Sequence, residues 1–81
     1  RQYLGRYGPS AFGAFDVVLR ADSSLALRNA RGDYQQLVPV RPNQFRIREA
    51  PEVTLEFSVV NGRATTLTAS DAAGEFTFMR Q

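Results

Sequence analysis

The stretch EVTLEFSVVNG, residues 52–62, decides the fold class of this chain. Its apolar side chains recur at every second position, and polar side chains lie between them: the apolar set is Val53, Leu55, Phe57 and Val59. Alternation over the nine residues 52–60 is typical of a strand with one buried face and does not fit a helix. The Asn-Gly pair that follows accepts positive φ at both residues, which a tight type I′ hairpin requires. The stretch therefore predicts a long strand that turns back sharply into a second one.

The same alternation extends to both sides of this hairpin. Short runs of period two are separated by clusters rich in Gly, Pro, Asn, Asp and Ser, at the spacing expected of a meander. The predicted strands are residues 2–8, 14–21, 24–29, 34–40, 44–49, 52–60, 63–70 and 74–80. The side chains expected to form one common core are Phe15, Val17, Leu25, Leu27, Phe45, Ile47, Leu55, Phe57, Leu67, Phe76 and Phe78.

Eight short strands in one flat sheet would expose two edges and an apolar face. Curling the sheet into an up-and-down barrel pairs the edges and buries that face. The sequence therefore predicts an all-β fold, an eight-stranded antiparallel up-and-down meander that forms a barrel or strongly curled sheet. Residues 1–81 would make a single domain. An eight-stranded barrel holds its own side chains or one small ligand, and with six Phe we expect side chains to fill it.

The composition argues against chemistry within the chain. There is no Cys and no His, and all ten basic residues are Arg, against eight acids. Thiolate chemistry and the commonest general base are therefore absent, and we expect no enzyme activity, no cofactor and no metal site in this chain. Carboxylates interleave with the arginines instead of leaving a stripe of one sign, so we expect no nucleic-acid partner. No apolar run is long enough for a transmembrane helix, so we expect no membrane insertion.

The order of several short motifs resembles a known family. The chain contains, in this order, YLGRY (3–7), LAL (25–27), LVP (37–39) followed by Phe45, and NGRATTL (61–67). Together they resemble the small C-terminal β domain that follows the catalytic domain in many bacterial serine hydrolases related to β-lactamases and penicillin-binding proteins. That domain is often described as lipocalin-like or as a domain of unknown function. One departure is the first loop, GPSAFGAF, which is more aromatic than the family pattern.

The resemblance implies a non-catalytic accessory domain. The catalytic motifs of that enzyme group, Ser-x-x-Lys and Lys-Thr-Gly, both contain Lys, which this chain lacks. The chain would then be the C-terminal fragment of a larger protein, and the catalytic domain of the parent chain would be its partner. It would pack on or regulate that domain or mediate assembly, with a homo-oligomer as an open alternative. The parent would be a bacterial protein exported to the periplasm or the medium.

Three apolar side chains are the candidate interface. Alternation places Leu4, Val18 and Met79 on the outer face, on the first, second and last strands. Closure of the barrel makes these strands neighbours, so the three side chains could form one patch. No catalytic or ligand-binding residue is assigned.

Two other functions stay open from the residues alone. A small-ligand carrier would need an unfilled cavity inside the barrel. An OB-type nucleic-acid-binding domain, with five strands, also fits this length and would need a continuous positive groove. Tyr3 and Tyr7, with Gly5 between them, could clamp an aromatic ligand, but we interpret them as ordinary residues of a first strand.

Overall fold

The computed structural model describes residues 2–8 and 14–81, and every regular element within these ranges is a β-strand. The strands are β1 Gly5–Gly8, β2 Phe15–Leu19, β3 Leu25–Arg28, β4 Tyr34–Arg41, β5 Gln44–Ile47, β6 Ala50–Val60, β7 Arg63–Asp71 and β8 Gly74–Arg80. Each lies on one of the runs predicted from alternation. Asn61 and Gly62 have φ of 53° and 78°, so the predicted hairpin turn between β6 and β7 is confirmed. Most of the aromatic first loop, residues 9–13, falls outside the described residues.

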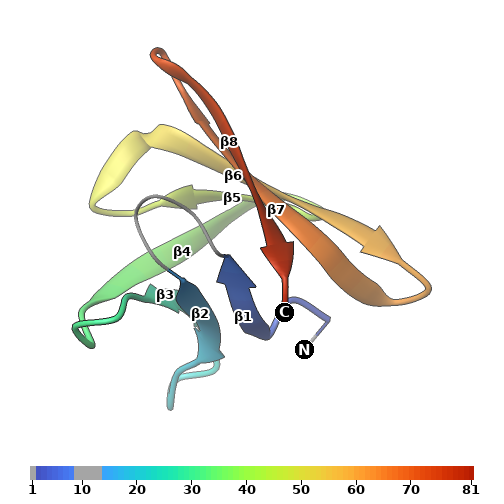
Figure 1. The fold of residues 1–81 in the computed structure, drawn as a ribbon. Helices are drawn as coiled ribbons and strands as arrows, with labels where there is room; N and C mark the ends of the chain where they lie inside the picture. Colours follow the sequence, from blue (N-terminus) through green and yellow to red (C-terminus); the bar gives the residue numbers. More distant parts are fainter. Residues whose placement is uncertain (1, 9–13) are drawn as a thin grey trace.

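The strands form a closed meander. Each strand pairs antiparallel with the next, and β8 returns to pair with β1 (Figure 1). The predicted all-β, eight-stranded antiparallel barrel is therefore confirmed. The topology is therefore not that of a five-stranded OB-fold.

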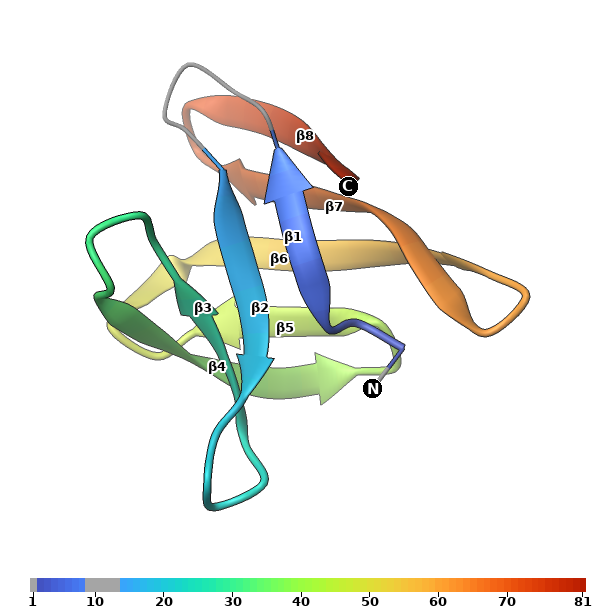
Figure 2. The same cartoon turned by 60° about the horizontal axis from the view of Figure 1, so that its bottom comes forward.

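The seams of the barrel differ in length. The β6–β7 ladder runs from Thr54 opposite Ser70 to Val60 opposite Arg63. The closing seam between β8 and β1 has only two paired positions, Tyr7 with Arg80 and Gly8 with Met79. The long β6–β7 and β7–β8 hairpins therefore project past the short strands β1–β3 (Figure 2).

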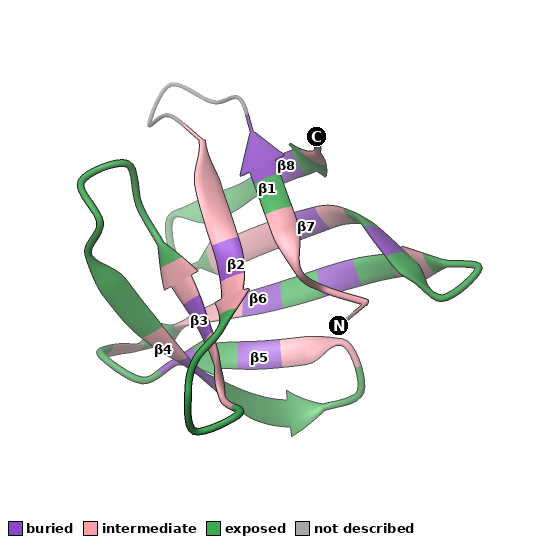
Figure 3. Ribbon diagram, turned by 90° about the horizontal axis from the view of Figure 1, so that it is seen from below, coloured by how far each residue is buried: buried purple, intermediate pink, exposed green. Residues whose placement is uncertain are grey.

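The inner face is a single apolar core. In β6, Leu55 and Phe57 are buried and Val53 and Val59 are half-buried, as the two-residue period predicts (Figure 3). Of the predicted core, Phe15, Leu25 and Leu27 are half-buried and pack against it. The buried cluster is Tyr7, Val17, Leu37, Phe45, Ile47, Leu55, Phe57, Ala64, Leu67 and Phe78.

Phe76 is an exception to the predicted core. It lies opposite Ala69 in the β7–β8 ladder, yet 54% of it is exposed. Two residues further on, Phe78 is 8% exposed and its ring meets Phe15 with centroids 4.8 Å apart. Because β1 reaches β8 only at Met79 and Arg80, the hairpin carrying Phe76 extends beyond the closed part of the barrel. The prediction that Phe76 is buried is wrong for this reason.

Candidate functional site

The side chains of Tyr3 and Tyr7 take part in the packing of the barrel. The Tyr3 ring packs on Phe45 and Phe57, with centroid distances of 5.3 and 4.5 Å. Its hydroxyl donates a hydrogen bond of 2.6 Å to Oδ1 of Asn43 in the β4–β5 turn. The Tyr7 hydroxyl donates to the Tyr3 carbonyl at 2.8 Å. The two tyrosines therefore pack and form hydrogen bonds inside the protein, but only Tyr7 lies in β1, and the predicted strand position of Tyr3 is wrong.

An arginine lies on the inner face beside this motif. Arg80 is opposite Tyr7 across the closing seam, so it continues the inward side of β8 after Phe78. Its Nη1 donates to the carbonyls of Gln2 and Ala64 at 3.4 and 3.3 Å. Burial raises the pKa of Tyr7, and the positive charge of Arg80 opposes that rise. A half-buried guanidinium thus sits where the N-terminal segment meets the start of β7.

Gly5 makes room for this guanidinium. A Cβ at this position would lie 3.0 Å from Nε and 3.3 Å from Nη2 of Arg80. The φ of Gly5 is also +146°, which side-chain-bearing residues rarely adopt. The positive φ and the nearby Arg80 side chain both favour glycine between the two tyrosines.

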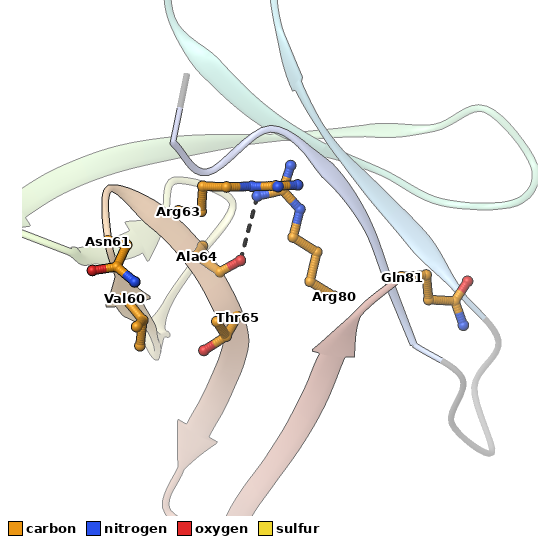
Figure 4. A pocket seen from close by; sticks show the side chains of 7 residues that line it. All are labelled: Val60, Asn61, Arg63, Ala64, Thr65, Arg80 and Gln81. Atoms are coloured by element: carbon orange, nitrogen blue, oxygen red, sulfur yellow. Dashed lines mark hydrogen bonds between the residues drawn. The ribbon is translucent and has the colours of Figure 1, made fainter.

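Arg80 and Arg63 line one open pocket. Its volume is about 440 Å³ (Figure 4). The other polar side chains that line it are Asn61, Thr65 and Gln81, with Val60 at its edge. Within residues 2–8 and 14–81, neither arginine forms an ion pair with a carboxylate; the described pairs are Arg6–Asp16 and Arg31–Asp33. The pocket therefore has two positive charges that the described part of the protein does not neutralise.

Arg80 is not among the predicted site residues, although its sequence context carries a signal. In GEFTFMR the alternation that turns Phe76 and Phe78 inward also turns Arg80 inward. A charged residue on an apolar face needs space and hydrogen-bond acceptors. The glycine in YLGRY supplies the space, but its contact with the Arg80 side chain becomes visible only once the barrel closes.

A second hollow lies at the turn between β2 and β3. It measures about 400 Å³ and is lined by Asp22, Ser23, Ser24 and the core-side residues Leu25, Leu37, Pro39 and Phe45. The barrel interior itself is occupied by aromatic rings that contact one another. Phe57, for example, meets Tyr3, Tyr7 and Phe45. A small apolar ligand would therefore find space at this opening and not in the centre of the barrel.

The structure does not bring the three candidate interface residues together as one outer patch. Leu4 packs against the core, because β1 begins only at Gly5 and the strand alternation does not extend to residue 4. Val18 is half-buried and lies opposite Ala26. Met79 is 59% exposed and lies opposite Gly8 at the far end of β1. The outer-face position predicted for Leu4 is wrong, while the role of Val18 and Met79 in an interface stays a prediction.

Arg6 and Asp16 form an ion pair on the surface of the barrel. Arg6 Nε donates to Asp16 Oδ1 at 3.0 Å across the β1–β2 ladder. This hydrogen bond is the main cause that lowers the pKa of Asp16, and the charges of Arg6 and Arg28 act in the same direction. In the part of the chain that the structure describes, no group of three or more acidic side chains could hold a metal ion. None of the described residues belongs to a helix long and apolar enough to cross a membrane.

Comparisons with known proteins find no relative of this chain. No protein-family model, no curated protein and no solved structure matches the chain. The resemblance to the domain that follows β-lactamase-related catalytic domains therefore depends on the short motifs alone.

Proposed function

We propose that this barrel is a non-catalytic accessory domain of a β-lactamase-related serine hydrolase and packs on the catalytic domain of its parent chain. The observation that supports this best is the closed meander into which the motifs fit in order. YLGRY leads into β1 and supplies its first three residues, LAL lies in β3, LVP lies in β4, and NGRATTL forms the turn and the start of β7. Each motif thus has a structural task in a fold of the kind that the resemblance implies.

The outer surface is the part of the barrel that is available to a partner. The interior is filled by side chains of the core cluster and by the Tyr3 ring packed against it. Outside, Met79 is exposed between Gly8 of β1 and Thr66 of β7. An apolar side chain among polar neighbours is typical of contacts between domains of one chain, which are more polar than obligate interfaces. Met79 is therefore the centre of the proposed interface.

The first test is the protein sequence that precedes residue 1. A Ser-x-x-Lys motif and a later Lys-Thr-Gly motif in the parent chain would agree with the proposal. A parent without either motif would contradict it.

The second test uses the parent protein with Met79→Ser. We expect limited proteolysis to release the barrel faster than from the unchanged parent, because the interface loses its central apolar contact. Val38→Ser is the matched control, since Val38 is an exposed apolar residue on β4, away from the closing seam. Equal proteolysis of all three proteins would contradict the docking of this face.

A second candidate function is binding of a small apolar ligand at the hollow beside β2 and β3. The side chains of Leu25, Leu37 and Phe45 favour it, because they present apolar surface at an opening of about 400 Å³. Titration with decanoate, followed by NMR, would shift the signals of these residues to saturation if the site binds such a ligand. Leu25→Asp should then abolish the shifts, and no saturable shift in the unchanged chain would exclude this function.

A further inference from the structure

Arg80 is held in one place by the protein. Its Nη1 donates to two backbone carbonyls, those of Gln2 and Ala64. The N–H of Ala64 in turn donates to the Gln2 carbonyl at 2.9 Å, which ties the N-terminal segment to β7. A guanidinium has five N–H donors, and those on Nε and Nη2 have no hydrogen-bond partner among the described residues. Arg80 is therefore positioned by two backbone carbonyls, and within residues 2–8 and 14–81 no acceptor faces its Nε and Nη2, which lie beside Gly5.

The charge of Arg80 is only partly compensated. Two carbonyl contacts of 3.3 and 3.4 Å are long for hydrogen bonds from a charged donor. Taking a charge out of water costs free energy unless an opposite charge accompanies it. Arg63 lines the same pocket and adds a second positive charge, and no Asp or Glu is among the lining residues. Two like charges that line one pocket repel, so an anion bound there would lower the free energy of this region.

We propose that Arg63 and Arg80 form a binding site for a phosphate dianion, either free phosphate or the phosphate group of a monoester. Two guanidinium groups match the charge of about −2 that a phosphate group carries at neutral pH. Arginine is suited to this ligand because its planar fork donates two parallel hydrogen bonds to phosphate oxygens. Asn61 and Gln81 also line the pocket, and Figure 4 shows the two arginine side chains between them. This site lies in the chain itself and does not depend on the proposed packing on a catalytic domain.

The test is an NMR titration of the 81-residue chain with inorganic phosphate. The readouts are the backbone amides of Ala64, Thr65 and Gln81 and the side-chain Nε–H of Arg80. We expect saturable shifts that sodium chloride at equal ionic strength does not reproduce. Shifts that rise without saturation, or that chloride reproduces, would reflect charge screening alone and would overturn the proposal.

A matched pair of variants locates the site. Arg63→Gln should weaken phosphate binding at least about tenfold, a loss that corresponds to one charge-assisted contact. Arg48→Gln removes the same charge from an exposed position in the β5–β6 turn and should leave the affinity unchanged. Arg80→Gln would also remove the hydrogen bond to the N-terminal segment, so a loss of binding in that variant would not be specific to the phosphate site. Arg63 is exposed, and Arg63→Gln is therefore the variant that tests the site. Equal weakening by Arg63→Gln and Arg48→Gln would show attraction to net charge and contradict a site.

A second titration with glycerol 2-phosphate distinguishes the two sources of the ligand. Equal affinity for both probes would assign recognition to the phosphate group alone. Tighter binding of the monoester would show that the organic part contacts the pocket as well, with Val60 as the apolar neighbour. Either result agrees with the site, and failure of both probes to bind would overturn it.

Discussion

The two halves of β8 have the same sequence pattern, but their inward side chains differ in how deeply they are buried. Phe76 and Phe78 are two residues apart on one face of the strand, but 54% of Phe76 is exposed and only 8% of Phe78. Phe78 lies where the barrel is closed, opposite Leu67 and against Phe15. Phe76 lies opposite Ala69 on the hairpin that extends past β1. Alternation therefore tells which face a residue occupies, whereas closure decides how deeply that face is buried.

The largest effect should follow from a change in the closed part. Phe57 contacts the rings of Tyr3, Tyr7 and Phe45 from the middle of the barrel. Phe57→Ala should cost about 3–5 kcal/mol, because it removes a buried ring and leaves a cavity. A domain of this size has little more stability than that, so we expect circular dichroism to show an unfolded chain. A Phe57→Ala variant that melts within a few degrees of the parent would contradict the buried position of this ring.

The second prediction compares the two phenylalanines of β8 directly. Phe78→Ala should destabilise by about 3 kcal/mol, as for other buried aromatic residues. Phe76→Ala should cost about 1 kcal/mol, since much of its ring is already in contact with water. Urea unfolding of both variants measures the difference. Equal losses of stability in the two variants would mean that the β7–β8 hairpin packs Phe76 as tightly as the closed part of the barrel packs Phe78.

The third prediction concerns Gly5 at the closing seam. Gly5→Ala should cost about 1–3 kcal/mol, because it combines a strained φ with a contact to Arg80. Gly74→Ala is the control: its φ of +141° is similar, but nothing lies within 4 Å of the added Cβ. Gly5→Ala should therefore be the more costly of the two in thermal unfolding. The extra cost should disappear when Arg80→Gln is also present, and its persistence would assign the strain to another neighbour.

The smallest effect should come from the surface pair that joins β1 to β2. The pKa of Asp16 is lowered in the folded protein, first by its hydrogen bond from Arg6. Ionised Asp16 therefore stabilises the folded protein at pH values above the unfolded pKa near 3.8. This stabilisation is lost as the pH falls through the lower pKa of Asp16 in the folded protein. Asp16→Asn should reduce the dependence of stability on pH in acid, measured by urea unfolding below about pH 4. Asp33→Asn, at an exposed carboxylate in the β3–β4 turn, controls for the loss of one charge. An unchanged acid profile in Asp16→Asn would show that the pair contributes nothing.

The fold was predictable because its signals are local. Alternation in residues 52–60 and the Asn-Gly turn define a hairpin without reference to the rest of the chain. The same rule locates the other strands and most of the core. It fails at Leu4, which lies just before β1 and turns to the core instead of the outer face.

The candidate site was not predictable in the same way. Arg63 and Arg80 share a pocket because β7 and β8 pair and because β8 then closes against β1. Gly5 leaves space for a side chain 75 positions away in the sequence. Such an arrangement depends on the register of the closing seam, which no local pattern contains.

Closure of the barrel can be measured at the seam between β8 and β1. An NMR spectrum of the chain should show nuclear Overhauser contacts between β1 and β8 at two positions, Tyr7 with Arg80 and Gly8 with Met79. The amide of Gln81 should be protected from exchange, because it donates to the Arg6 carbonyl at 2.8 Å. These contacts together with the seven other ladders would establish a closed barrel with Arg80 on its inner side. All other ladders without any β1–β8 contact would show an open sheet, and the burial, the role of Gly5 and the arginine pocket would have to be abandoned together.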